Sequence, residues 1–275
     1  MDLVFSEEAL QYRSAGHPES PDRVKKAHSY LKDKYEINEP IQASVEDLLL
    51  VHDEDFVQRV KEGRFSDPDC PNYEDLFFYA TLSAGGAITA QKKGSLSLMR
   101  PPGHHAGRDF LGGFCYLNNL AIAVEKSGLR TLIVDFDAHH GNGTEDIYLG
   151  REDVTYLSLH RSPGFPGTGQ ESRKNVINHP VSPMIGDKKY LDLLGKELER
   201  LSKKEFEQVA LSAGFDGHKD DPLASLGLST SAFQEIGKYL KKMDLPTFGV
   251  LEGGYIGEDL GRNIDAFLKG FNSRY

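Results

Sequence analysis

Three residues of the types that bind divalent metal ions stand at the ends of predicted strands. Asp137 and His139 leave an apolar run two positions apart, so their side chains point to the same side while the chain stays extended. Asp216 is the best third ligand, because it directly follows another largely apolar run. The weaker candidates come after it in the chain: His218, Asp220 and Asp221. Two carboxylates and one imidazole suit Zn²⁺, with Fe²⁺ or another divalent ion as the alternative, in a catalytic site that keeps a bound water.

Each of these residues also has a purely structural explanation when it is taken alone. Asp137 and His139 could form an ordinary solvated strand end, and Asp216 could form a turn before Gly217. That explanation is weaker for the group, because Asp135 lies in the same predicted strand, where a buried carboxylate is costly unless it is paired or hydrogen-bonded. We therefore interpret the group as a metal centre.

A pair of adjacent histidines, His104 and His105, follows Pro101-Pro102-Gly103. This rigid turn would hold the two imidazoles in fixed directions. Because their pKa values are ordinarily near neutral, histidines suit general acid and base catalysis. The alternative is a surface loop whose histidines are incidental or bind a metal themselves. Asp135 and Asn142 are the nearby residues that could fix the tautomers.

Tyr255 follows Glu252-Gly253-Gly254, at the end of another apolar run. The two glycines would let the backbone approach a ligand closely. The phenol could donate a hydrogen bond to a developing oxyanion. The alternative is a packing tyrosine beside a Gly-Gly turn.

Two phenylalanines lie in loops that are rich in glycine and proline. Phe114 follows Gly112-Gly113, and Phe165 lies within Ser162–Gly169. They could face each other across a narrow slot for an aliphatic chain, or either could simply belong to the core. We expect neighbouring Cys115 to be a small buried hydrophobe, because no base is evidently assigned to it.

These polar residues follow short apolar runs that alternate with longer segments at helical spacing, which is the pattern of a parallel sheet covered on both faces. The predicted strands are Leu3–Phe5, Ser95–Met99, Arg130–Phe136, Val154–Leu159, Gln208–Ser212 and Thr247–Leu251. The predicted helices are Pro21–Lys34, Val45–Lys61, Tyr73–Lys92, Asn118–Lys126, Lys188–Lys203, Thr230–Lys242 and Asp259–Lys269. Ligands bind beyond the carboxyl ends of such strands, so five loops should converge on one site. We predict one α/β domain over residues 1–275, with three αβα layers and a mainly parallel sheet.

Composition and charge argue against several functions. The chain has 275 residues, and 32 Lys and Arg against 42 Asp and Glu give a net charge of −10, opposite in sign to what phosphate-backbone binding requires. No run approaches the length of a membrane span, and the first residues do not resemble a secretion signal. Two cysteines cannot supply a disulfide framework. We expect a cytoplasmic protein without direct nucleic-acid or membrane binding, and composition leaves its oligomeric state open.

Several motifs in this order along the chain resemble the histone deacetylase superfamily. They are His17–Arg23, Arg100–Ala106, Gly113–Asn119, Asp135–Thr144, Phe165–Gly169, Ser212–Asp216 and Glu252–Tyr255. The match covers nearly the whole chain, and the ordered set is far more specific than any single motif. The resemblance implies an arginase-like α/β fold and a Zn²⁺-dependent amidohydrolase that removes acyl groups from lysine or another amine.

The resemblance also implies a role for each catalytic residue. It implies that Asp137, His139 and Asp216 bind the metal ion. It implies that His105 transfers protons, with His104 and Asp135 as an electrostatic pair. It also implies that Tyr255 polarises the amide carbonyl. Asn142 stands where some family members carry Asp, so it would not raise the pKa of His105 as a carboxylate does, which favours a neutral imidazole.

Further residues are implied around the substrate and beneath the metal. The substrate slot would include Asp69, Gly113, Phe114, Phe165 and Leu223, with Asp69 at the rim. A structural K⁺ would lie near Asp135, Asp137, His139, Ser158 and Leu159. The chain is shorter than many relatives, so the loops around the entrance should be trimmed and the site more open.

Several hypotheses remain for the activity. The leading one is deacetylation of acetyl-lysine or a related acylated amine. The alternative is an acetylpolyamine or other small-amide hydrolase, against which Leu223 argues mildly because a polyamine enzyme should carry an extra acidic residue near the slot. A catalytically silent acyl-binding module and an arginase-type enzyme with two metals are less favoured, because the proton-transfer residues are all present and a second full ligand set is not seen.

Overall fold

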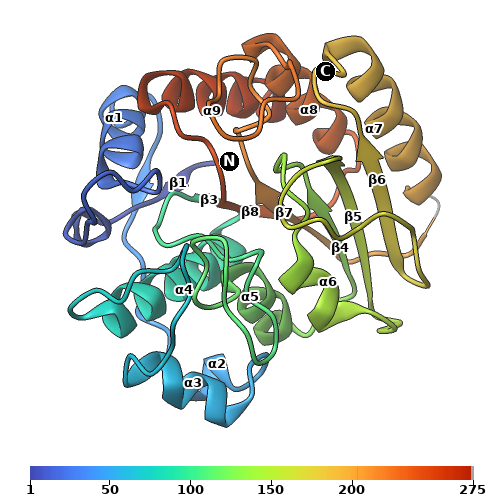
Figure 1. Cartoon of the computed structure of the whole chain (residues 1–275). Helices are drawn as coiled ribbons and strands as arrows, with labels where there is room; N and C mark the ends of the chain where they lie inside the picture. The colour runs from blue at the N-terminus through green and yellow to red at the C-terminus, as the bar shows by residue number, and fades with distance from the viewer. Residues whose placement is uncertain (203, 274–275) are drawn as a thin grey trace.

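The apolar runs of the sequence form eight parallel strands in one sheet, in the computed structural model that describes residues 1–202 and 204–273 (Figure 1). The strands are β1 (Leu3–Val4), β2 (Ile37–Asn38), β3 (Leu96–Ser97), β4 (Thr131–Asp135), β5 (Val154–Arg161), β6 (Val176–Val181), β7 (Gln208–Ala213) and β8 (Thr247–Leu251). Their order across the sheet is β2-β1-β3-β8-β7-β4-β5-β6. Every strand pair is parallel, so all carboxyl ends lie along one edge of the sheet.

Helices cover both faces of the sheet (Figure 1). One face carries α1 (Pro21–Leu31), α7 (Asp187–Leu201), α8 (Thr230–Lys241) and α9 (Gly257–Phe271), with the short 3₁₀ helix η1 (Glu7–Leu10) beside α1. The other face carries α2 (Val45–Leu48), α3 (Glu54–Lys61), α4 (Leu76–Lys93), α5 (Asn119–Ser127) and α6 (Asn142–Tyr148). Side chains of β4 alternate between two cores, because Leu132 and Val134 face one helical layer and Ile133 faces the other. The predicted three-layer α/β fold is confirmed.

One predicted helix is wrong, because Val45–Lys61 forms two helices, α2 and α3. Ser44 and Asp47 make a capping box that starts α2, and this helix ends after one turn. The break places the His52 ring in the interior, where Nδ1 lies 2.8 Å from the Gly107 carbonyl oxygen. Hydrogen bonds across the layer therefore override the apolar periodicity of this segment.

Four elements were not predicted from the sequence, among them the short 3₁₀ helix η1, and several boundaries differ from the predicted ones. Strand β6 contains His179 and Pro180, which hide its strand pattern, and the proline is tolerated because β6 lies at the sheet edge. Strand β2 has only two residues, and α6 starts within a Gly-rich segment. The last residue of the predicted helix Lys188–Lys203 lies outside the described residues, as do positions 274 and 275 of the predicted domain. Within the described ranges, no helix is both long and apolar enough to cross a membrane.

Candidate active site

Loops that follow the sheet strands meet beyond their carboxyl ends. Gly253, after β8, donates its N–H to Oδ2 of Asp137, after β4, at 2.7 Å. Asp216, after β7, approaches His139, and the ring of Phe165, after β5, lies 6.2 Å from the His139 ring between centroids. The structure therefore brings residues from distant parts of the chain into one buried cluster.

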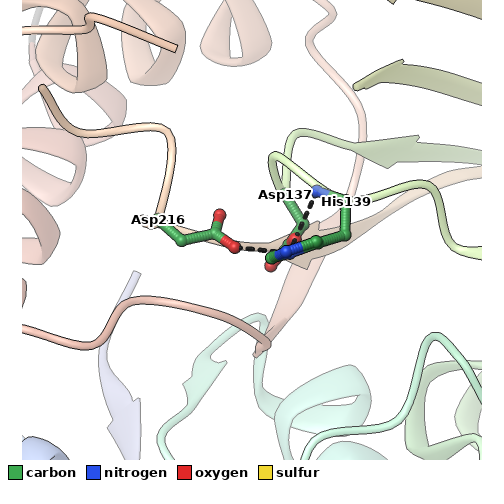
Figure 2. A group of neighbouring side chains, drawn as sticks. All are labelled: Asp137, His139 and Asp216. Atoms are coloured by element: carbon green, nitrogen blue, oxygen red, sulfur yellow. Dashed lines mark hydrogen bonds and ion pairs between the residues drawn. The ribbon is translucent and has the colours of Figure 1, made fainter. Parts of the chain in front are cut away.

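Asp137, His139 and Asp216 form the centre of this cluster (Figure 2). Nδ1 of His139 lies 3.0 Å from Oδ1 of Asp137 and 2.8 Å from Oδ2 of Asp216. One possible ligand atom from each residue lies within 4.8 Å of the others. The alternative third ligands lie elsewhere, since His218 and Asp220 group with Asp259 instead.

The donor set fits a divalent cation. The outer carboxylate oxygens are already satisfied, because Oδ1 of Asp216 accepts the Ala138 N–H at 2.9 Å and Oδ2 of Asp137 accepts that of Gly253. Oδ2 of Asp216 is buried but has no hydrogen bond of good geometry, despite its closeness to His139. A Cβ at position 253 would lie 2.5 Å from that oxygen, so only glycine permits this close approach.

The charges in the cluster also favour a bound cation. Burial and the neighbouring charge of Asp137 raise the pKa of Asp216 to about 7. Burial lowers the pKa of His139, but the carboxylates of Asp216 and Asp137 outweigh burial and hold it well above its usual value. A positive charge between the two groups, from a proton on His139 or from a bound cation, would keep both carboxylates ionised.

The implied K⁺ position lies beneath this cluster. Asp135 and Ser158 are register partners at the carboxyl ends of β4 and β5, and Leu159 is the next residue of β5. The hydroxyl of Ser158 lies 2.9 Å from Nδ1 of His160. The structure brings the expected residues together, and K⁺ binding itself stays a prediction.

His104 is buried and held by carboxylates. Its Nδ1 lies 3.1 Å from Oδ2 of Asp135, and its Nε2 lies 3.9 Å from Oδ1 of Asp137. Tyr156 donates to the same oxygen of Asp135 at 2.8 Å and so keeps that carboxylate in place. Burial lowers the pKa of His104, but Asp135 and Asp137 outweigh it and raise the pKa to about 10. The two carboxylates therefore favour the protonated form of the ring.

His105 has the opposite electrostatic character. Its Nδ1 lies 2.8 Å from Oδ1 of Asn142, which accepts a hydrogen bond from Nδ1–H, so Nε2 is the unprotonated nitrogen of the neutral ring. Burial and the charge of neighbouring His104 hold the pKa of His105 well below its usual value. The ring centroids of the two histidines are only 4.0 Å apart. The surroundings therefore favour the protonated form of His104 and the neutral form of His105, and a general base must be neutral.

Tyr255 lies on the loop after β8, beside the ring of Phe114. Its backbone N–H donates to Oδ2 of Asp221 at 2.8 Å, and the Arg23 guanidinium carbon lies 5.0 Å from its ring centroid. Burial raises the pKa of the Tyr255 phenol, which outweighs the opposing effect of Arg23. The phenol consequently stays protonated and can donate a hydrogen bond.

Phe114 and Phe165 border the catalytic groups. The ring centroid of Phe165 lies 5.1 Å from that of His105, and the Phe114 centroid lies 5.9 Å from that of Tyr255. A Cβ at Gly113 would lie 2.4 Å from Cδ2 of His105 and 3.0 Å from Cε1 of Phe165, so this glycine separates the two rings. The two phenylalanine rings therefore lie beside the catalytic side chains.

The two remaining implied residues lie further out. The backbone oxygen of Asp69 lies 3.3 Å from Nε2 of His17. The His17 ring in turn packs on the ring of Phe114. Leu223 is 40% exposed, and its N–H donates to Asp221 at 2.9 Å. The structure therefore links Asp69 to the Phe114 wall and Leu223 to the Tyr255 loop.

Two buried carboxylates had no role in the sequence analysis. Glu252 is fully buried, and its side chain accepts hydrogen bonds from the loop of His104. Asp221 was considered only as a weak metal ligand, whereas its two oxygens accept the N–H groups of Tyr255 and Leu223. For Glu252 the available signal was the same as for Asp135, a carboxylate next to a buried strand, but sequence spacing does not show which backbone groups it meets. Asp221 lies in the loop that follows β7 and gave no such signal.

The sequence of this chain is similar to those of known proteins. A family model described as the histone deacetylase domain matches residues 17–271. A probable deacetylase from Methanothermobacter thermautotrophicus is 39% identical over 259 residues, which cover 85% of this chain and 78% of the relative. An acetylpolyamine amidohydrolase from Burkholderia pseudomallei is 35% identical over 228 residues, covering 76% of this chain and 67% of the relative.

Solved structures agree with these sequence matches. The HD domain of HDA15 superposes with a TM-score of 0.92 at 28% identity, covering 100% of this chain and 91% of the other. An acetylpolyamine aminohydrolase from Burkholderia pseudomallei gives a TM-score of 0.91 at 25% identity, with 99% of both chains covered. The resemblance expected from the sequence motifs is confirmed by both comparisons.

Proposed function

This chain belongs to the histone deacetylase family, whose similar members are named as hydrolases of acylated amines, and on that premise we propose that it deacetylates acetyl-lysine in proteins or peptides with Zn²⁺ as cofactor. The observation that carries this proposal is geometric: the ring centroid of His105 lies 6.0 Å from that of His139, and its Nδ1 lies 2.8 Å from Oδ1 of Asn142. A neutral His105, held by Asn142, lies in the same buried cluster as the fitted cation site and the protonated Tyr255. Amide hydrolysis needs a base, a later acid and an oxyanion donor in this arrangement.

A divalent ion held by Asp137, His139 and Asp216 would supply Lewis-acid polarisation of the amide carbonyl and a more acidic water. His105 accepts the proton of the attacking water at Nε2, the nitrogen that Asn142 leaves free. His105 then returns that proton to the leaving amine. Burial and the charge of His104 favour the neutral form of His105 before the reaction.

Tyr255 contributes to the same step from the other side of the cluster. Its phenol donates a hydrogen bond to the carbonyl oxygen as negative charge develops there. Phe114 and Phe165 contact the catalytic rings and would pack on the methylene chain of the acylated amine. The two rings would also exclude water from around the methylene chain of the substrate. Hydrogen bonds within the cluster are stronger when water is excluded.

An acetylated polyamine is the second candidate substrate. It is favoured by the acetylpolyamine amidohydrolases among both the sequence relatives and the structural neighbours. The apolar, 40% exposed side chain of Leu223 favours the peptide instead, because it offers no charge for a second ammonium group. Binding of a peptide would place backbone groups near Asp69 at the rim.

The test is acetate release from an acetyl-lysine peptide and from acetylated polyamines by the Zn²⁺-loaded protein. His105→Ala and Asp216→Ala serve as the matched variants, with bound metal measured for each. We expect turnover only by the wild type, loss of turnover with a chelator, and a higher kcat/KM for the peptide. A higher kcat/KM for polyamines would overturn the substrate assignment.

Two further outcomes separate the remaining hypotheses. Wild type that binds Zn²⁺ but releases acetate from no substrate would contradict the proposed deacetylase activity and would direct the test to longer acyl chains. Two metal ions per chain would instead indicate an arginase-type centre.

A further inference from the structure

A buried carboxylate outside the metal cluster holds the turn that carries the two histidines. Oε2 of Glu252 accepts the N–H of Gly103 at 2.8 Å and the N–H of His104 at 3.2 Å. We infer that Glu252 is a positioning residue for proton transfer, because it fixes the backbone that presents His104 and His105. This inference rests on the proposed function, since it assigns a role within the same site.

Glu252 is itself fixed from several directions. Its side chain is 0% exposed, and Ser212 donates its hydroxyl to Oε1 at 3.2 Å. Its backbone oxygen accepts a hydrogen bond from Arg23, and its own N–H donates to the Ala213 carbonyl at 3.0 Å. The carboxylate therefore links the end of β8 and the end of β7 to the turn after β3.

The turn is also held on its carbonyl side. The backbone oxygen of His104 accepts the N–H groups of Gly143 and Thr144, each at 3.1 Å. Within the described residues, Glu252 supplies the acceptor for the N–H groups on the opposite side. Without it, two buried N–H groups would lose their acceptor, and the turn would relax or admit water.

The consequence for catalysis follows from the short hydrogen bonds of the histidine side chains. His104 meets Asp135 at 3.1 Å and His105 meets Asn142 at 2.8 Å, and both contacts depend on where the turn places the two Cα atoms. A shift of the turn would break the tautomer control of His105 without touching the aromatic walls. The expected loss is therefore in kcat rather than in KM.

The Glu252→Gln substitution separates positioning from charge at this residue. A glutamine side chain has the same shape as glutamate, so its amide oxygen can accept both N–H groups while its NH₂ donates to the Ser212 hydroxyl. The negative charge is removed, but all three hydrogen bonds are kept. Alanine removes the charge and the hydrogen bonds together.

The experiment compares Glu252→Ala and Glu252→Gln in the full Zn²⁺-loaded chain. Glu197→Ala is the matched control, because Glu197 is also a buried carboxylate but lies on α7 and pairs with Arg200. The measurements are kcat and KM on an acetyl-lysine peptide, and amide hydrogen exchange of peptides covering residues 100–107. Exchange reports the order of the turn even if no substrate is turned over.

We expect Glu252→Ala to lower kcat by about 100-fold, with KM within about threefold of wild type, as a small misplacement of a catalytic group does. Glu252→Gln should restore kcat to within about fivefold, because it keeps the hydrogen bonds. Exchange in residues 100–107 should accelerate in the alanine variant only, and Glu197→Ala should change neither measurement.

Three results would overturn the inference. The first is a Glu252→Ala variant with wild-type kcat, and the second is unchanged exchange in residues 100–107. The third is an equal loss of kcat in the Gln and Ala variants, which would assign the effect to charge. If the alanine variant does not fold, Glu252→Asp replaces it, because the shorter side chain withdraws the acceptor and should give an intermediate loss of kcat. If wild type itself is inactive, the proposed function fails while the exchange result still decides the positioning role.

Discussion

The floor and the rim of the site are built in different ways. The floor consists of side chains at strand ends, such as Asp137 and Asp216, which are fully buried and hydrogen-bonded to backbone N–H groups. The rim consists of loop side chains, such as Phe165 and Leu223, which are 48% and 40% exposed. The sheet therefore fixes the groups that do chemistry, and the loops carry the groups that select the substrate. Changes in the floor should lower kcat, whereas changes in the rim should alter KM or substrate preference.

The largest effect is expected from Tyr255→Phe, which removes the phenol hydroxyl but keeps the ring beside Phe114 and Arg23. Loss of one oxyanion donor should lower kcat by about 10²- to 10³-fold. Steady-state kinetics on the acetyl-lysine peptide check this, with bound metal and thermal stability as controls. A kcat close to that of the wild type would contradict the role of Tyr255 as an oxyanion donor.

Asn142→Asp tests the electrostatics of the floor. In the wild type, burial and His104 hold the pKa of His105 well below 6.5, so the base stays neutral to low pH. A carboxylate at position 142 would favour the imidazolium and raise the pKa of His105 by about one unit or more. Because only the neutral ring is a base, the acid limb of the kcat/KM profile should move to higher pH. An unmoved limb would show that another group controls it.

Phe165→Ala tests the inner edge of the rim. Removing the ring that packs on His105 takes away apolar contact with the substrate chain, so KM should rise about tenfold with little change in kcat. Kinetics over a series of substrate concentrations separate the two constants. A fall in kcat at constant KM would place Phe165 with the floor instead.

The smallest effect is expected from Leu223→Glu, with Leu223→Gln as the neutral control. An exposed carboxylate attracts a second ammonium group only weakly, so the ratio of kcat/KM for polyamine to peptide should rise about threefold. The rise should shrink at high salt, since exposed charges are screened. An equal rise in the glutamine variant would point to shape rather than charge.

The residues of the floor could be predicted from the sequence more completely than those of the rim. Asp137 and His139 stand two positions apart after a buried strand, and Asp216 follows a second such strand, so the sheet geometry alone predicts that they can meet. The central strands were also recognisable, because each is a short apolar run. The edge strand β6 was not, since His179 and Pro180 interrupt its apolar pattern.

Contacts between distant backbone groups could not be read from the sequence. Glu252 looked like an ordinary member of a Gly-Gly motif, yet it meets Gly103, 149 positions away. His52 interrupts a helical pattern because its ring hydrogen-bonds to Gly107 and Asn118 in the interior. In both cases the deciding partner is a main-chain group, whose position depends on the whole fold.

The strand order also limits when the site can exist during synthesis of the chain. Strands β7 and β8 lie between β3 and β4 in the sheet, although they follow β6 in the sequence. Until they emerge, no strand joins the β2-β1-β3 group to the β4-β5-β6 group among the strands that the structure describes. The histidine turn after β3 and the ligands after β4 therefore belong to separate pieces of a nascent sheet. A ribosome-bound chain that ends before residue 247 would lack the strand that brings them together, so the site would assemble only after β8 (Thr247–Leu251) has been made.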